Sequence, residues 1–295
     1  MALRFLLVAL ALPWLPLPRL EALESEAVER PGVKSVRLLT DISAIVPGEP
    51  FTVALQLEPM PDHHTYWRGP GIVGVATRID WTLPEGFRAG EILWPPPQSV
   101  RMAGILANGY KTPTLLLTEI TPPEHSTADR VTLSARCSWM ACAVSCNPGT
   151  ADLQLVLPIA KPGETPPRDA ALSAAFASAR EQAPKPAPAA WTFQPRLPAA
   201  DRIQIDLVVP GLSPDAAESL HFFCDDMQID SDEPQRIEIV DAAAGAVRIS
   251  LYRPEFAPKS PDRLSGVIRC PDGWPGLEAE FVEFSAPWPE GTFSK

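Results

Sequence analysis

Three of the five cysteines, Cys137, Cys142 and Cys146, lie within one short segment, and their thiols are the groups in this chain best suited to chemistry. Cys142 and Cys146 are four residues apart. A disulfide joins Cα atoms about 4.4–6.8 Å apart, whereas four residues of extended strand span about 13 Å. Residues 143–145 must therefore turn if the two sulphurs bond, and Asn147-Pro148-Gly149 is a turn signal that could hold such a bend.

The shortness of the Cys142–Cys146 loop bears on what a disulfide there would do. Only three residues separate the two cysteines, so in the chain-entropy model the bond gains less stability than one closing a long loop. A reversible redox pair is then favoured over a structural staple, and a plain structural disulfide is the alternative.

The N-terminus predicts export. Arg4 precedes an apolar run over 5–17 that Pro13 and Pro16 interrupt, which is typical of a secretory signal peptide. We place the signal peptide at 1–22, although Leu20-Glu21-Ala22 is a poor cleavage site. The run is too short to span a membrane comfortably, so we expect an exported protein that is not membrane-spanning once processed and that is free to form disulfides.

Composition predicts an all-β fold. The chain has 295 residues, of which 36 are proline and 45% hydrophobic. Proline at this density fits turns far better than helix interiors, while the apolar content is high enough for packed cores. The net charge of −11 argues against a nucleic-acid partner, which needs a positive field.

The hydrophobic pattern predicts two immunoglobulin-like β-sandwich domains joined by a Pro-rich linker with a short helix. Apolar residues alternate over 51–58, which is typical of a half-buried strand. The predicted domains are 33–157 and 191–288, with a linker at 158–190 whose helix covers 168–182. Segments 60–76 and 88–113 are rich in glycine, proline and aromatic residues, and we expect long ordered loops there. The remaining predicted strands are 77–83, 114–120, 131–138, 152–157, 203–209, 236–240, 247–252, 266–270 and 280–285.

Several motifs follow one another in the order found in a known family. The sequence W-M-A-C-A-V-S-C-N-P-G at 139–149 resembles the W-L-x-C-x-x-x-C-x-P-G segment of the periplasmic N-terminal region of DsbD-type thiol:disulfide interchange proteins, especially the ScsB-like branch. H-T-Y-W-R-G-P-G at 64–71 and T-R-I-D-W-T-L-P-E-G-F at 77–87 also fit that family. The resemblance is specific over 33–157 and looser over 190–288.

The resemblance implies a function and a set of site residues. It implies an immunoglobulin-like domain in which Cys142 and Cys146 are catalytic and exchange electrons with periplasmic partner proteins. Tyr66 and Trp67 would belong to a loop that shields the pair, although packing against the end of the sandwich explains them equally well. Trp139 is better explained as core. This thiol chemistry needs no cofactor.

The chain departs from the family in two respects. Long family members continue into transmembrane helices and a thioredoxin-like domain, which this sequence lacks. We therefore expect a protein-disulfide reductase type of module that depends on thioredoxin-like periplasmic proteins and a separate membrane electron carrier. The alternative is a family member that has lost redox turnover. Cys137 is additional and unassigned, and it should share a strand face with Trp139 because a spacing of two preserves the side.

The two remaining cysteines lie in the second half of the chain. Cys224 and Cys270 fall on or beside predicted strands of one exported domain, so we predict a structural disulfide between them, with free buried thiols as the alternative. A bond closing a loop of that length would contribute about 4 kcal/mol in the chain-entropy model.

Two rival functions remain open. Thiolates suit Cu(I), so Cys137, Cys142 and Cys146 together with His63 or His64 would make a copper-tolerance module if the loops converge. The other is a non-catalytic β-sandwich assembly domain. The sequence holds no serine–histidine–aspartate set, phosphate loop or HExxH motif, and our main interpretation has no metal site.

Overall fold

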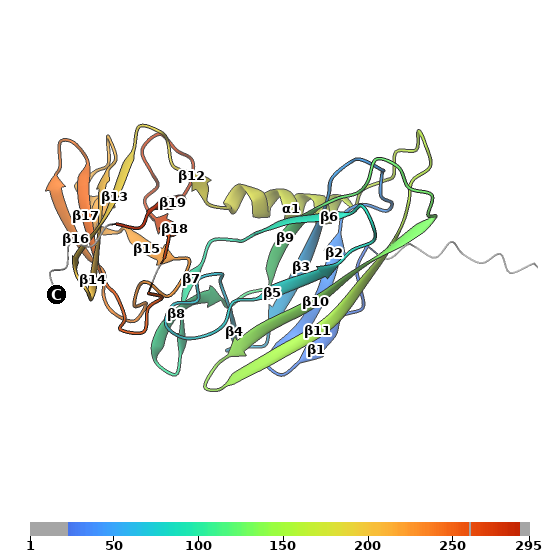
Figure 1. Cartoon of the computed structure of the whole chain (residues 1–295), viewed down its shortest axis with the longest axis horizontal. Helices are drawn as coiled ribbons and strands as arrows, with labels where there is room; N and C mark the ends of the chain where they lie inside the picture. The colour runs from blue at the N-terminus through green and yellow to red at the C-terminus, as the bar shows by residue number, and fades with distance from the viewer. Residues whose placement is uncertain (1–22, 260, 290–295) are drawn as a thin grey trace, which may run out of the picture.

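The computed structural model describes residues 23–259 and 261–289, so the predicted signal peptide at 1–22 lies outside the described residues. Two β-rich units lie side by side along the long axis of the molecule, and a helix bridges the space between them (Figure 1). The prediction of an all-β protein built from β-sandwiches is confirmed.

The first unit is a sandwich of two antiparallel sheets. One sheet has the order β1 (Val28–Arg30), β2 (Val33–Thr40), β3 (Phe51–Pro59), β9 (Thr114–Thr121) and β6 (Arg88–Leu93). The other has the order β11 (Cys146–Pro158), β10 (Arg130–Cys142), β4 (His64–Tyr66), β8 (Ile105–Tyr110) and β7 (Gln98–Met102), and β5 (Arg78–Thr82) also pairs with β10. Alternate residues of β3, β10 and β11 meet in one core between the sheets, as their period-two pattern requires.

The predicted loops at 60–76 and 88–113 are wrong in part, because they contain β4, β6, β7 and β8. These strands have three to six residues each, too few for a clear alternation. Turns separate them closely: Ala103 and Gly104, between β7 and β8, both have positive φ. The glycines and prolines of these segments therefore mark turns between short strands.

The second unit is built from two four-stranded sheets. One has the order β12 (Lys185–Pro186), β19 (Phe281–Pro287), β18 (Arg263–Arg269) and β15 (His221–Cys224). The other has the order β13 (Thr192–Ala199), β14 (Arg202–Val208), β17 (Ala246–Tyr252) and β16 (Arg236–Asp241). A short helix, α2 (Pro214–Glu218), packs into the core that the two sheets enclose.

The predicted linker helix is present as α1 (Ala170–Gln182). Asp169 caps it by accepting a hydrogen bond from the Leu172 amide at 2.8 Å. Phe176 is buried against Leu39 and Leu117 on the outer face of the first sheet, so the helix is docked on the first unit. No helix in the described part of the chain is long and apolar enough to cross a membrane.

The predicted Cys224–Cys270 disulfide is wrong, because both cysteines are unpaired and buried. The sheet register gives the reason. Cys224 pairs with Gly266 at one end of the β15–β18 ladder, and Cys270 lies four residues beyond Gly266, past the other end. That spacing puts the two residues about 13 Å apart along the strands, well outside the range of a disulfide. The alternative, two buried free thiols, is the one observed.

Candidate functional site

A disulfide joins Cys142 to Cys146 at the tip of the β10–β11 hairpin. The two residues are directly opposite in the ladder, with Cα atoms 4.2 Å apart. The chain reverses within residues 143–145, where the Ala143 amide donates to the Ser145 carbonyl at 3.1 Å. The sequence argument that these three residues must turn is confirmed. Figure 1 shows the tip at the end of the first unit that faces the second.

The suggestion that Asn147-Pro148-Gly149 holds the bend is wrong, because these residues already belong to β11. Gly149 instead accommodates Trp139, its partner across the hairpin. A Cβ atom on Gly149 would lie 2.4 Å from the indole ring. Trp139 itself is buried in the sandwich core, where the sequence placed it.

The two disulfide-bonded cysteines differ sharply in exposure. Cys142 is fully buried, whereas Cys146 is exposed, as is the tip residue Val144, at 92%. A thiolate on another protein can therefore approach Cys146 and not Cys142. Of the two cysteines in the disulfide, only Cys146 is accessible to another protein.

Cys142 lies in a small apolar cluster beneath the hairpin tip. It packs with Tyr66, Val100 and Ala107, and the partly buried residues of this cluster are Val73, Met102 and Met140. Tyr66 is fully buried, and a Cβ on Gly74 would lie 2.1 Å from its ring, so the chain at Gly74 passes directly over Tyr66. Burial raises the pKa of Tyr66 to about 12. The structure thus brings Tyr66 to the cysteine pair.

Trp67 does not join Tyr66 in this cluster. It is also fully buried, but it packs edge-on against Phe223 of the second unit, with ring centroids 6.4 Å apart. The other buried members of that cluster are Tyr110, Val267 and Phe281. Trp67 therefore lies at the contact between the two units, away from the disulfide.

His64 also lies beside the disulfide, although the sequence analysis named it only as a possible copper ligand. It is opposite Cys142 in the β4–β10 ladder and is 3% exposed. Burial is the main cause that lowers its pKa to about 4, and the positive charges of Lys111 and His63 act in the same direction. The imidazole is therefore neutral at pH 7. Its position two residues before Tyr66 was the sequence signal, since alternate residues of a strand share a face.

Cys137 takes no part in this site. It lies in the sandwich core with Trp139, as the spacing of two predicted, whereas Cys142 points to the other face of β10. Five residues of strand separate the two by about 16 Å. Burial, reinforced by Asp80 and Asp152, raises the pKa of the Cys137 thiol to about 12. In the described part of the chain, no three histidine, cysteine, aspartate or glutamate side chains converge as metal ligands.

A family model covers the segment that contains this site. Residues 35–158 match the model of the N-terminal region of the thiol:disulfide interchange protein DsbD. This segment is a DsbD N-terminal domain. None of the curated protein sequences matches the chain significantly.

A solved structure extends the likeness in fold to both units. The crystal structure of the N-terminal periplasmic domain of ScsB from Proteus mirabilis is similar, with a TM-score of 0.61 and 18% sequence identity. The match covers 91% of this chain and 99% of that one. The DsbD N-terminal domain and the second unit therefore occur together in a known fold.

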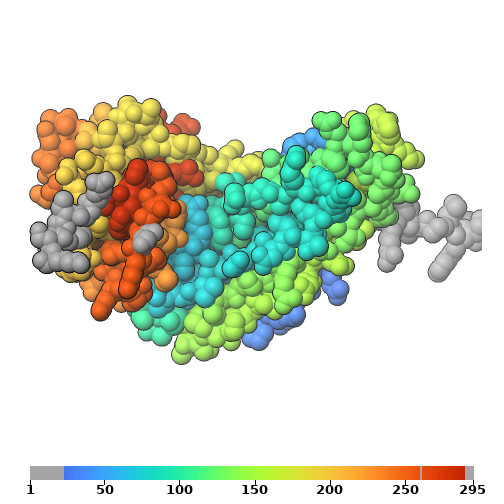
Figure 2. Space-filling view, in the orientation of Figure 1, coloured from blue at the N-terminus to red at the C-terminus, as the bar shows by residue number. Residues whose placement is uncertain are grey.

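The segment after Trp67 ties the DsbD N-terminal domain to the second unit. Arg68 Nε and Asp225 Oδ1 form an ion pair at 2.6 Å. Ser231 Oγ accepts from the Ile72 amide at 3.1 Å and donates to the Leu106 carbonyl at 2.7 Å. The two surfaces merge in Figure 2, where the cyan residues of the domain lie against the orange residues of the second unit. One short stretch, 64–72, therefore contacts both the disulfide cluster and the second unit.

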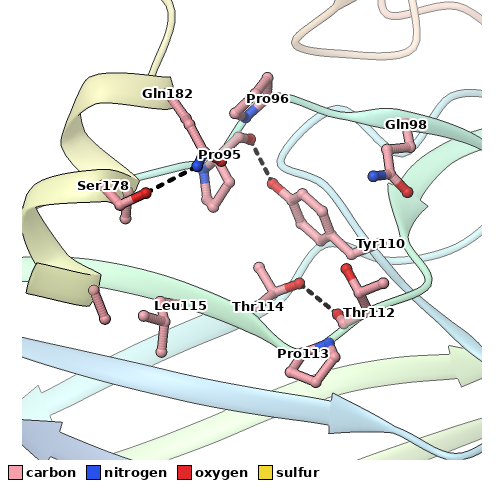
Figure 3. Close-up of a pocket in the computed structure, with 12 residues that line it drawn as sticks. Pro95, Pro96, Gln98, Tyr110, Thr112, Pro113, Thr114, Leu115, Ser178 and Gln182 are labelled. Atoms are coloured by element: carbon pink, nitrogen blue, oxygen red, sulfur yellow. Dashed lines mark hydrogen bonds between the residues drawn. The ribbon is translucent and has the colours of Figure 1, made fainter. Parts of the chain in front are cut away.

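A separate cavity of about 360 Å³ lies between α1 and the DsbD N-terminal domain (Figure 3). Tyr110 spans it and donates from its hydroxyl to the Pro95 carbonyl at 2.8 Å. Two further hydrogen bonds are local: Gln182 donates to Ser178, and Thr114 donates to the Thr112 carbonyl. No cysteine or charged side chain lines this cavity, so we assign the chemistry to the hairpin tip.

Proposed function

We propose that this protein is an exported thiol–disulfide exchange module that passes reducing equivalents to or from periplasmic partner proteins through Cys142 and Cys146. The observation that carries the proposal is the hairpin-tip disulfide with one exposed sulphur. The family of residues 35–158, described as thiol:disulfide interchange, supports it.

The order of the exchange steps follows from the exposure of Cys146 and the burial of Cys142. A partner thiolate attacks Cys146 Sγ, forms a mixed disulfide and breaks the Cys142–Cys146 bond, whose electron pair goes to Cys142 Sγ. The partner's second cysteine thiolate then attacks the sulphur of the partner's first cysteine in the mixed disulfide. This step releases Cys146 and leaves the partner with a disulfide. Both cysteines take up protons and end as thiols. The same steps in reverse transfer electrons from this protein to an oxidised partner.

The partners we propose are thioredoxin-like periplasmic proteins on one side and a separate membrane electron carrier on the other. Thioredoxin-like proteins carry a nucleophilic thiolate at a surface, which suits attack on an exposed residue such as Cys146. Location in the periplasm follows from the signal peptide predicted at 1–22.

Trapping of mixed disulfides tests the proposal. The Cys142→Ser variant retains exposed Cys146 without a resolving thiol, so we expect it to hold a disulfide-oxidised thioredoxin-like protein in a complex that dithiothreitol releases. The Cys146→Ser variant retains only buried Cys142 and should trap little. Cys137→Ser is the control and should behave as the wild type.

The redox potential of the pair separates exchange from a structural role. A potential above about −300 mV is expected for an exchanging pair. A potential well below that value, together with no trapped complex in either single variant, would contradict the proposal.

A further inference from the structure

Four consecutive residues beside the disulfide each carry a buried polar atom without a hydrogen-bond partner. These atoms are His64 Nε2, Thr65 Oγ1, Tyr66 Oη and Trp67 Nε1, and they are four of seven such side-chain atoms in the part of the chain that the structure describes. Buried polar groups are normally paired, and leaving one unpaired is costly. Because these atoms are concentrated on and next to β4, we looked for a hydrogen-bond acceptor that the disulfide form lacks and the reduced form would supply.

The strand register places two of the four on the same side as Cys142. His64 is directly opposite Cys142, and Thr65 is opposite Ala141. Directly opposed residues have Cβ atoms about 4.5–5.5 Å apart and share a face. Tyr66 is on that face too, because it lies two residues after His64 and packs in the Cys142 cluster. Thr65 points to the opposite face.

We propose that His64 and Tyr66 donate hydrogen bonds to the Cys142 thiolate when the disulfide opens, which makes Cys142 the leaving sulphur and Cys146 the sulphur that partners attack. This inference rests on the proposed exchange function and adds the residues that stabilise its charged intermediate.

The chemistry of sulphur explains why the donors are unpaired here. A disulfide sulphur is a poor acceptor, whereas a thiolate is an anion, and hydrogen bonds to charged groups are the stronger ones. When a partner thiolate bonds to Cys146 Sγ, the electron pair of the broken bond moves to Cys142 Sγ, inside an apolar cluster where an unpaired charge would be costly. The thiolate later takes a proton from water.

Both side chains keep the hydrogen that they would donate. The pKa of His64, lowered to about 4, leaves a neutral imidazole with one N–H, and in the tautomer protonated on Nε2 that N–H belongs to the buried, unpartnered nitrogen. The pKa of Tyr66, raised to about 12, keeps its hydroxyl protonated. The positive charges of Lys111 and His63 act on His64, and the β10 neighbours on this face, Met140 and Cys142, carry no acidic group.

The pKa of the Cys142 thiol tests the proposal directly. We would measure it in the full chain carrying Cys146→Ala, from thiolate absorbance at 240 nm between pH 4 and 9. Loss of one hydrogen bond to a charged group corresponds to a rise in the thiol pKa of about 1 to 2. We expect that rise in both Tyr66→Phe and His64→Leu, with partial rescue in His64→Gln, which restores an N–H.

Thr65→Val is the matched control, since it removes an equally buried, unpartnered hydroxyl one residue away on the other face. It should leave the Cys142 pKa unchanged. Tyr66→Phe keeps the ring and hence the packing, so it stays informative if His64→Leu does not fold. An unchanged pKa in Tyr66→Phe, or an equal rise in Thr65→Val, would overturn the proposal.

A second readout uses the intact disulfide. A leaving thiol of lower pKa departs faster, so Tyr66→Phe and His64→Leu should each slow opening of the disulfide by dithiothreitol by about tenfold. Unslowed opening in both variants counts against the proposal. The wild type could exchange with no protein partner while Tyr66→Phe and His64→Leu still raise the pKa of the Cys142 thiol. That result would contradict the proposed function and would support the hydrogen bonds to Cys142.

Discussion

The three cysteines outside the disulfide have raised thiol pKa values, and burial is the main cause in each. The pKa of Cys137 is raised to about 12, that of Cys270 to about 11, and that of Cys224 to well above the usual value. Only the thiolate reacts in exchange. Environment, more than residue type, therefore separates exposed Cys146, our proposed exchange residue, from the three buried thiols.

Thiol labelling tests this separation. After mild reduction of the folded protein, iodoacetamide at pH 8 should modify Cys146 first, because a thiol of pKa about 11 is ionised to only about one part in a thousand at that pH. Cys137, Cys224 and Cys270 should react only after unfolding in urea. Peptide mass spectrometry distinguishes the sites. Labelling of Cys137 at the rate of Cys146 in the folded protein would contradict the assignment.

Buried His64 and half-buried His221 predict how stability depends on pH. The pKa values of His64 and His221 are lowered to about 4, chiefly by burial. The unfolded chain, with histidine pKa near 6.5, binds more protons between about pH 4 and 6.5, so stability rises with pH in that window and falls on acidification. We expect a loss of about 1–2 kcal/mol per histidine between pH 7 and 5 in urea unfolding.

Histidine variants provide the matched comparison. His221→Gln should reduce the pH 7 to pH 5 loss, whereas His125→Gln, at an exposed position, should leave it as in the wild type. An identical loss in His221→Gln would show that other groups govern the pH dependence.

The sequence identified the pair of cysteines that forms the disulfide and missed His64 as its neighbour. Cys142 and Cys146 are close in the chain, so their relation is local. His64 reaches Cys142 only through the pairing of β4 with β10, a contact between residues far apart in sequence. The error about Cys224 and Cys270 has the same origin, since the β15–β18 register that separates them is a tertiary property.

At the scale of elements, the long strands with one face in a core were predictable and the short ones were not. β10 was expected over 131–138 because its burial alternates there. It continues to Cys142, where both faces are covered by the core and by the Tyr66 cluster, and the alternation ends. β4 is buried at all three residues and offers no period to detect. The strand that pairs with β10 at Cys142 is therefore the one with the weakest sequence signal.

The β10–β11 hairpin depends on the close approach of Trp139 to Gly149. A Cβ at Gly149 would meet the indole at 2.4 Å, so Gly149→Ala should lower the free energy of unfolding by about 1–3 kcal/mol, as overpacking does. Gly90→Ala in β6 is the control, because its Cβ would lie 3.5 Å from the Glu119 carbonyl, an ordinary contact. Urea unfolding should separate the two variants. Equal stabilities would refute the packing argument.

At the scale of the whole molecule, the contact between the units lies next to the redox site. Trp67, Arg68 and Gly69 follow directly after Tyr66, so the strand that covers Cys142 continues into the segment that binds the second unit. The division into domains at 33–157 and 191–288 stays a prediction about independent folding. Because the second unit holds residues 67–72 in place, we expect it also to restrain Tyr66, which directly precedes them.

Gly69 allows a test of this coupling. A Cβ there would lie 1.9 Å from the Cys224 carbonyl oxygen, which is backbone and has little room to move. Gly69→Ala should therefore loosen the contact between the units, increase amide hydrogen exchange over 66–74, and slow reduction of the Cys142–Cys146 disulfide by dithiothreitol, because Tyr66 is held less firmly beside the leaving sulphur of Cys142. Gly90→Ala, the same substitution far from the contact, should change neither. Faster exchange over 66–74 with an unchanged reduction rate would show that the second unit holds the segment without positioning Tyr66 for the opening of the disulfide.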